Sequence, residues 1–143
     1  MRTIKFRGKR IDNGEWVYGY YARLRNEFKE WHCIMTEKDA SENYIKDCNG
    51  YNMLYTPVNH NTVGQFTGLY DKNGEEIYEG DILALHETDN IVTHCPVSMN
   101  CKGYWSIDFG INYGAYLGLV DKKRVEIIGN IHDNPELQKG GEK

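Results

Sequence analysis

The run Gln65–Asp81 reads QFTGLYDKNGEEIYEGD, and it predicts a β-hairpin followed by a bend into a further strand. Its first five residues are β-prone. The Asp-Lys-Asn-Gly sequence at 71–74 favours a tight turn, because Asn and Gly tolerate the positive φ that such turns need. Ile77 and Tyr78 then return to an apolar layer, and Gly80 bends the chain. Strand, turn and strand therefore follow one another within this single run.

Nine positions carry the pattern of this run, and turn chemistry accounts for the polar and glycine positions among them. Glycine supplies positive φ or a close backbone approach. Aspartate closes Asx turns or hydrogen-bonds a bend through its side chain. We interpret the nine positions as a structural signature, not as a ligand site: Gln65, Phe66, Gly68, Asp71, Gly74, Ile77, Tyr78, Gly80 and Asp81.

Turn signals divide residues 63–137 into short strands at regular spacing, which is typical of a small barrel or curled sheet. The expected strands are 63–69, 81–86, 91–98, 103–109, 116–119 and 125–131. The glycine-aspartate bend before the second of these favours an SH3-like barrel by analogy. Asp133 or Asn134 is expected to cap a short helical turn that begins at Pro135. Residues 138–143 should form a frayed tail.

The first 25 residues predict a basic β-hairpin. Apolar and basic residues alternate along its first strand, and Asp12-Asn13-Gly14 gives a turn before an aromatic second strand. Lys5, Arg7 and Lys9 are therefore expected on one face. Residues 1–25 hold seven basic and two acidic side chains, whereas the remainder holds ten and nineteen. This asymmetry is the clearest physical indication of a partner.

The variable segment 26–62 gives a weaker pattern. His32–Met35 predicts a short strand, and Tyr51–Val58 predicts another that Pro57 limits. Residues 39–47 fit either a helical turn or an irregular loop.

The bulk composition is that of an ordinary globular protein. The chain has 143 residues, of which 40% are hydrophobic and 27% are charged. This length supports one domain with a core that needs no disulfide. No signal-peptide pattern is present, and no apolar run approaches the roughly 20 residues of a membrane helix. We expect one domain, 1–143, in the cytoplasm and away from membranes, with reduced thiols at Cys33, Cys48, Cys95 and Cys101.

Three stretches of the chain resemble the YopX family of small phage and prophage proteins. Ile4-Lys5-Phe6-Arg7 matches the family's opening strand, and Thr62–Ile82 contains its long signature. Val125–Leu137 matches its closing strand and its Asn-Pro-Glu-Leu end. The centre, residues 26–58, departs from the pattern. The resemblance implies a phage or prophage origin and a mostly β fold, and it carries over no catalytic residue.

Metal-binding and catalytic patterns are weak. His32-Cys33 and His94-Cys95 are adjacent pairs, and neighbouring side chains on a strand point to opposite faces, so one pair does not readily supply two zinc ligands. The chain lacks a phosphate-binding glycine loop, a nucleophile elbow and an H-E-x-x-H motif. We predict no metal, no cofactor and no catalytic residue.

The first functional hypothesis is a non-enzymatic accessory protein that acts as a binding or assembly module, through self-association or a protein partner. Aromatic side chains are favoured at such interfaces. The alternative is nucleic-acid binding by the hairpin, with cations on phosphates and rings stacked on bases. Its candidate residues are Lys5, Arg7, Lys9, Arg10, Arg23, Arg25, Tyr18 and Tyr20. An enzyme of unidentified class is the third hypothesis. The sequence leaves open whether the hairpin aromatics face the core or the solvent.

Overall fold

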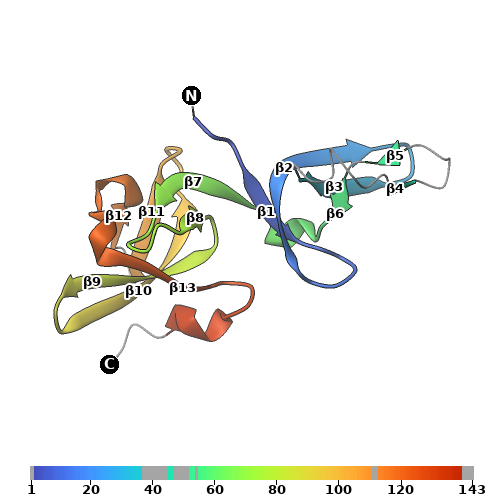
Figure 1. Cartoon of the computed structure of the whole chain (residues 1–143). Coiled ribbons are helices and arrows are strands. Elements are labelled where there is room, and N and C mark those ends of the chain that lie inside the picture. The colour runs from blue at the N-terminus through green and yellow to red at the C-terminus, as the bar shows by residue number, and fades with distance from the viewer. Residues whose placement is uncertain (1, 37–44, 47–51, 54, 111–112, 140–143) are drawn as a thin grey trace. The chain divides into compact units, whose positions relative to one another are not determined.

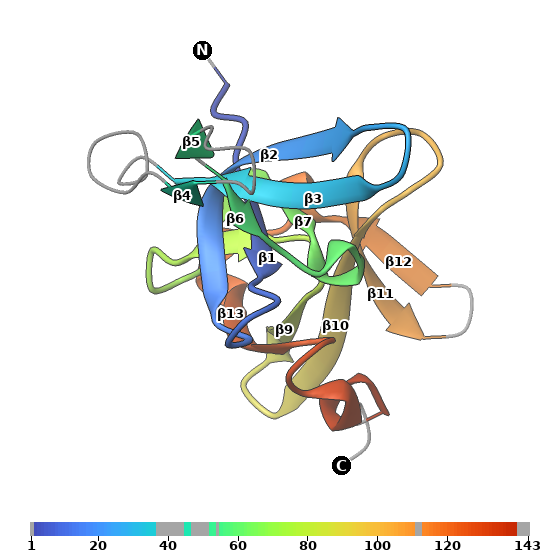
Figure 2. The same cartoon turned by 90° about the vertical axis from the view of Figure 1, so that its right-hand side faces the viewer.

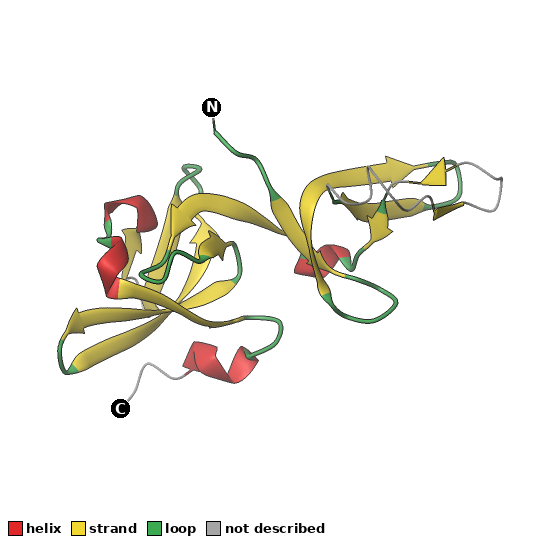
Figure 3. Ribbon diagram, in the orientation of Figure 1, coloured by secondary structure: helices red, strands yellow, loops and turns green. Residues whose placement is uncertain are grey.

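The computed structural model describes residues 2–36, 45–46, 52–53, 55–110 and 113–139, and most of these lie in β-strands (Figure 1, Figure 3). The mostly β prediction is confirmed. The chain forms two compact units, residues 1–65 and 66–143. Strand β7 (Gly64–Tyr70) begins in the first unit and continues in the second, so the division falls inside the signature run. The assignment of the whole chain to one domain stays a prediction.

Antiparallel strands make up the N-terminal unit. The predicted hairpin is present, with Phe6 opposite Gly19 and Lys9 opposite Trp16. The order of neighbouring strands is β6-β3-β2-β1, and β1 also pairs with the start of β7. A separate two-stranded sheet pairs β4 with β5, and the rest of residues 39–51 lies outside the described residues. The strands are β1 (Phe6–Lys9), β2 (Trp16–Arg25), β3 (Glu30–Met35), β4 (Ile45–Lys46), β5 (Asn52–Met53) and β6 (Thr56–Pro57).

The segment after β6 joins both ends of this curled sheet. The Val58 N–H donates to the His32 carbonyl at 2.8 Å, and the Asn59 N–H donates to the Lys9 carbonyl at 2.8 Å. One short segment is therefore hydrogen-bonded to β3 on one side and to β1 on the other. Val58 and Ile34 are buried in the interior. A 3₁₀ turn at His60–Thr62, capped by Asn59, then leads into β7.

Gly19 allows β2 and β3 to approach closely. A Cβ atom at this position would lie 2.0 Å from the carbonyl oxygen of Met35. That separation is far below van der Waals contact, and the obstructing atom belongs to the main chain, so neither strand can move aside cheaply. A side chain at position 19 would therefore force the hairpin away from β3.

The C-terminal unit is built on a five-stranded antiparallel sheet in the order β12-β11-β10-β9-β13, and β7 pairs with β8 (Figure 1, Figure 2). Leu83, Cys95, Val97, Ile107 and Val125 are among the buried residues of its core. The strands are β8 (Glu76–Tyr78), β9 (Asp81–Thr88), β10 (Ile91–Met99), β11 (Trp105–Gly110), β12 (Tyr113–Tyr116) and β13 (Val125–Asn130). The SH3-like detail stays a prediction.

One predicted strand of this unit is wrong. A strand was expected at 116–119, but the observed strand β12 covers Tyr113–Tyr116 and so ends where the expected strand begins. Leu117–Leu119 forms a 3₁₀ turn instead. Gly114 lies in β12 opposite Asp108. Its missing side chain suits a position where a Cβ would come within 3.2 Å of the Ile107 carbonyl oxygen.

The C-terminal helical turn is present as a 3₁₀ helix at Pro135–Lys139. Residues 138 and 139 therefore belong to this turn and not to a frayed tail, while 140–143 lie outside the described residues. Asn130 organises the approach to the turn, because its Oδ1 accepts hydrogen bonds from the N–H groups of His132 and Asp133 at 3.0 and 2.9 Å.

Hydrophobic residues of the signature run lie in the interior of the C-terminal unit. Phe66 is buried, and its ring lies 5.6 Å from that of Tyr70 and 5.5 Å from that of Tyr78. Ile77 is fully buried, and Gln65 pairs with Phe6 of β1 in the N-terminal unit. The three signature glycines all have positive φ: Gly68 at 82°, Gly74 at 80° and Gly80 at 85°.

Two buried aspartates of the run accept hydrogen bonds from main-chain N–H groups. Asp71 Oδ1 accepts from the N–H groups of Asn73 and Glu75 at 2.8 and 2.9 Å, and its Oδ2 accepts from the Ile127 N–H at 3.1 Å. Asp81 Oδ2 accepts from the Tyr78 N–H at 2.7 Å. Asp71 therefore connects its own turn to β13, and Asp81 closes the bend before β9.

We predict that Gly19→Ala destabilises the protein by about 3 kcal/mol, because the new methyl group meets the Met35 carbonyl. Urea unfolding measures this loss. Gly118→Ala is the matched control, since no heavy atom lies within 4 Å of a Cβ built there. Equal stability of the two variants would contradict the close approach of β2 and β3.

We predict that Asp71→Ala lowers the free energy of unfolding by about 3 kcal/mol, because three N–H groups, two of the turn and one of β13, lose the buried carboxylate that accepts from them. Asp121→Ala is the control, since exposed Asp121 accepts from one N–H, that of Lys123. It should cost about 1 kcal/mol. Thermal unfolding that ranks the two variants equally would contradict the role of Asp71.

Candidate functional site

The N-terminal hairpin places basic and aromatic side chains opposite one another. Arg7 lies opposite Tyr18, and Lys9 lies opposite Trp16. Directly opposed residues of an antiparallel pair project to the same face of the sheet. The Arg7 guanidinium lies 4.6 Å from the centre of the Trp16 ring, and the Lys9 ammonium lies 5.5 Å from it. Cations and rings therefore alternate on this face, which we call the hairpin face.

The tyrosines of the hairpin face are open to solvent. Tyr18 is 43% exposed and Tyr20 is 55% exposed, whereas Arg7 is 6% exposed. Tyr21 points to the other face, where its ring contacts that of Phe6 at 5.6 Å. The sequence left open whether the hairpin aromatics face the core or the solvent. In the structure, one face of β2 carries the exposed Tyr18 and Tyr20, and the other carries Tyr21, which packs on Phe6.

The eight residues predicted for nucleic-acid binding do not form one stripe. Tyr18 and Tyr20 occupy even-numbered positions of β2, and Arg23 and Arg25 occupy odd-numbered ones. Successive side chains of a strand point to opposite faces, so the tyrosines and these arginines lie on opposite faces. Arg23 pairs with Glu30 at 2.6 Å, and Arg10 pairs with Asp12 at 2.6 Å. The Arg10 hydrogen bond holds the pKa of Asp12 below its usual value of 3.8. Arg25 is exposed, and Lys5 is half-buried just before β1.

A chain of polar side chains on the second face was not found from the sequence. The Tyr21 hydroxyl lies 2.5 Å from His32 Nδ1, and His32 Nε2 lies 3.0 Å from Glu30 Oε1. A carboxylate only accepts hydrogen bonds, so His32 Nε2 donates to Glu30, while Nδ1 shares a hydrogen bond with the Tyr21 hydroxyl. Glu30 Oε2 accepts from Arg23 at 2.6 Å. The alternation of side chains along β2 and β3 indicates which residues of each strand share a face. It does not give the register between the two strands, which brings Tyr21, His32 and Glu30 together.

Electrostatics in this polar chain follow from its ion pair. The Arg23 hydrogen bond lowers the pKa of Glu30 from its ordinary value of 4.5, and the same contact raises the pKa of Arg23. His60 stacks on His32 with ring centres 4.9 Å apart. His32 is therefore positioned by a tyrosine, a glutamate and a second histidine.

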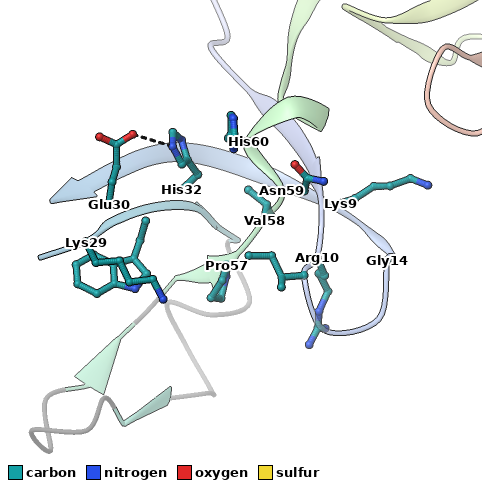
Figure 4. Close-up of a pocket in the computed structure, with 12 residues that line it drawn as sticks. Lys9, Arg10, Gly14, Lys29, Glu30, His32, Pro57, Val58, Asn59 and His60 are labelled. Atoms are coloured by element: carbon teal, nitrogen blue, oxygen red, sulfur yellow. Dashed lines mark hydrogen bonds and ion pairs between the residues drawn. The ribbon is translucent and has the colours of Figure 1, made fainter.

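A pocket of about 670 Å³ opens beside these residues (Figure 4). One side is formed by the turn after β1, and the other by the first half of β3, with the segment after β6 between them. Its lining combines apolar, basic and histidine side chains: Lys9, Arg10, Ile11, Gly14, Lys29, Glu30, Trp31, His32, Pro57, Val58, Asn59 and His60.

The two buried cysteines, Cys33 and Cys95, are unreactive. Burial raises the pKa of the Cys33 thiol and raises that of Cys95 to about 12. Both thiols stay protonated at neutral pH and are poor nucleophiles and metal ligands. Cys101 is exposed, and Cys48 lies outside the described residues. Within the described part of the chain, no group of three or more His, Cys, Asp or Glu side chains is arranged to hold a metal ion.

Comparison with known proteins gives one family. The family model described as YopX protein matches residues 5–139. The chain belongs to the YopX family. The match covers residues of both compact units, including the hairpin and the signature run. No curated protein matches the chain.

Two solved structures support this assignment at the level of the fold. Protein EF1440 from Enterococcus faecalis is 24% identical, covers 96% of this chain and 99% of its own length, and gives a TM-score of 0.56. Protein yopX from Bacillus subtilis is 18% identical, covers 98% of each chain, and gives a TM-score of 0.55. Among the described residues, no helix has the length and apolar character needed to cross a membrane.

We predict that Arg23→Gln raises the pKa of Glu30 toward 4.5, because it removes the hydrogen bond that lowers it. A lowered folded pKa stabilises the protein above the unfolded value and loses that effect as pH falls through the folded value. The variant should therefore lose less stability on acidification than the wild type. Carboxyl NMR titration and urea unfolding at neutral pH and about pH 3 measure both effects.

Glu126 provides the internal control for this titration. Its pKa is lowered by a hydrogen bond from Lys72, so Arg23→Gln should leave it unchanged. A Glu30 titration that is the same in both proteins would contradict the assignment to Arg23.

Proposed function

We propose that the protein is a non-enzymatic binding or assembly module, that the hairpin face is its contact surface, and that its first partner is a second copy of the chain. The observation that carries this proposal is the exposure of Tyr18 and Tyr20 beside the Arg7–Trp16 stack. Tyrosine, tryptophan and arginine are the residues most enriched at energetically important positions of protein interfaces.

The arrangement of charge favours a protein partner over a polyanion. Arg10 and Arg23 already pair with carboxylates, and Arg7 is buried. The formal net charge of the whole chain is −4. Residues 1–25 are nevertheless basic and the remainder is acidic, which suits head-to-tail contact between copies. Cations stacked on Trp16 also stiffen the hairpin face, and this lowers the entropic cost of binding.

We also propose that the protein acts in the cytoplasm as an accessory protein of a phage or an integrated prophage. Membership of the YopX family supports this origin.

The assembly proposal predicts a defined oligomer that weakens but persists at high salt, because salt screens the contacts between opposite charges and not the apolar and aromatic contacts. Light scattering after gel filtration at several protein concentrations measures the mass. Changing both Tyr18→Ser and Tyr20→Ser should shift the protein to the monomer.

Tyr104→Ser is the control for this measurement, since Tyr104 is exposed as well, at 57%, but lies in the C-terminal unit. It should leave the mass unchanged. A wild-type protein that stays monomeric at every concentration, or a control that dissociates equally, would overturn the assembly proposal.

The second candidate function is binding of single-stranded nucleic acid by the same face, and the alternation of cations and rings favours it. Labelled single-stranded DNA should then bind at low salt and dissociate at high salt. Lys5→Glu with Lys9→Glu should abolish binding, while Lys122→Glu with Lys123→Glu should not. Arg7 is left unchanged in this test because it is buried, so its substitution would disturb the fold. Binding that ignores salt, or equal loss in both double variants, would rule this function out.

A further inference from the structure

The C-terminal unit has a pocket of about 610 Å³ between the end of β9 and the turns that follow β12. We call it the β9 pocket. Leu85 and Glu87 of β9 line one side of it, and Arg124 lies across from them at the start of β13. The remaining walls are mostly apolar, and they are formed by Ala115, Leu119 and Val120.

Leu119 is an uncovered apolar side chain at this pocket. It is 82% exposed and belongs to the 3₁₀ turn Leu117–Leu119. The Val120 N–H donates to the Leu117 carbonyl at 3.1 Å, and Leu117 is buried, so the turn is fixed to the unit. An ordered, exposed leucine beside an apolar pocket is stabilised when another apolar group covers it.

The polar groups of the β9 pocket offer an acceptor. Thr93 Oγ1 donates to Glu87 Oε1 at 2.8 Å, so within the described part of the chain Glu87 Oε2 stays available to a further donor. Arg124 is already engaged, because its Nε donates to the His86 carbonyl at 3.0 Å and an Nη to the Glu87 carbonyl at 3.3 Å. The pocket therefore suits an apolar group that carries a hydrogen-bond donor.

Charge favours a basic surface as the one that covers this unit. Residues 66–143 hold seven basic and thirteen acidic side chains, whereas residues 1–25 hold seven basic and two acidic ones. The pocket of Figure 4 is lined by three cations and one carboxylate, and it would repel a basic hairpin. A further pocket, beside Asn100 and Tyr116, has no acidic lining residue. Of these three pockets, the β9 pocket fits a basic, aromatic surface best.

The hairpin face has the matching chemistry. Tyr18 and Tyr20 are exposed on it, beside the cations that stack on Trp16. A tyrosine ring can cover apolar walls while its hydroxyl donates to a carboxylate. Two hairpin faces brought together would instead oppose cation to cation. A contact between unlike surfaces of two copies avoids this repulsion, and it closes into a ring when the rotation permits.

We propose that the β9 pocket receives the hairpin face of a second copy of the chain, with a tyrosine ring against Leu119 and its hydroxyl on Glu87. The inference rests on the proposed function and deepens it, because it names the surface that the second copy offers to the hairpin face. The contact is head-to-tail, and each copy contributes one half of the site.

The test mixes two variants of the full chain. The pocket variant is Leu119→Ser, at a position so exposed that the fold should not suffer, and the hairpin variant changes both Tyr18→Ser and Tyr20→Ser. Each alone should be monomeric by light scattering after gel filtration. Their mixture should form a one-to-one complex, because the hairpin variant keeps an intact pocket and the pocket variant keeps an intact hairpin face.

A second variant tests the carboxylate of the pocket. Glu87→Ala should weaken association about tenfold, because it removes the acceptor of the tyrosine hydroxyl. Glu75→Ala is the matched control, since Glu75 is an exposed glutamate of the same unit that does not line the pocket. It should leave the association unchanged, as should Tyr104→Ser. Circular dichroism confirms that each variant is folded.

The outcomes separate this inference from the proposed function. A pocket variant that associates like the wild type, while the hairpin variant is monomeric, would overturn the inference and leave the proposed function standing. A mixture that stays monomeric, or equal weakening by Glu75→Ala and Glu87→Ala, would also overturn the inference. A wild-type protein that is monomeric at every concentration would overturn both.

Discussion

The buried carboxylate of Asp71 is the interaction on which the C-terminal unit most depends. It accepts two N–H groups of its own turn and a third from Ile127 in β13. The Lys72 N–H also donates to the Val125 carbonyl, so the turn is attached to β13 twice. A carboxylate with so little exposure to water is tolerated only because its oxygens have donors. The tight turn of the signature run thereby fixes β13, the edge strand of the five-stranded sheet.

The N-terminal unit depends most on the close approach of backbone segments at two glycines. Gly19 lets β2 lie against the Met35 carbonyl, and Gly8 leaves room for Val58 and Ile34. With these side chains absent, the sheet curls until residues 57–59 reach both β3 and β1. This curl decides the surface of the unit. Tyr18 and Tyr20 lie outward on the hairpin face, and the segment after β6 lies against β3 at His32.

The hairpin face carries side chains of the kind that are enriched at protein interfaces. The hairpin face has exposed rings beside stacked cations, and the pocket of Figure 4 is lined by apolar, basic and histidine side chains. The Tyr21–His32–Glu30 chain includes two residues that line the pocket, and it fixes the orientation of His32. Such positioning rigidifies a recognition surface, because each polar group has its partner before a ligand arrives.

The sequence alone determined the features that depend on neighbouring residues. Positive φ at Gly74 and Gly80, the Asx turn at Asp71 and the basic–aromatic hairpin all follow from local chemistry, since turn geometry and strand alternation involve only a few consecutive positions. Tertiary structure decided the features that depend on distant partners. Gly114 pairs with Asp108 of the neighbouring strand, and Arg7 is buried with its guanidinium over the Trp16 ring. The contacts of Asp71 with Ile127 and of Tyr21 with His32 join different strands. No local pattern encodes which strands become neighbours, because register and burial are settled by packing the whole sheet.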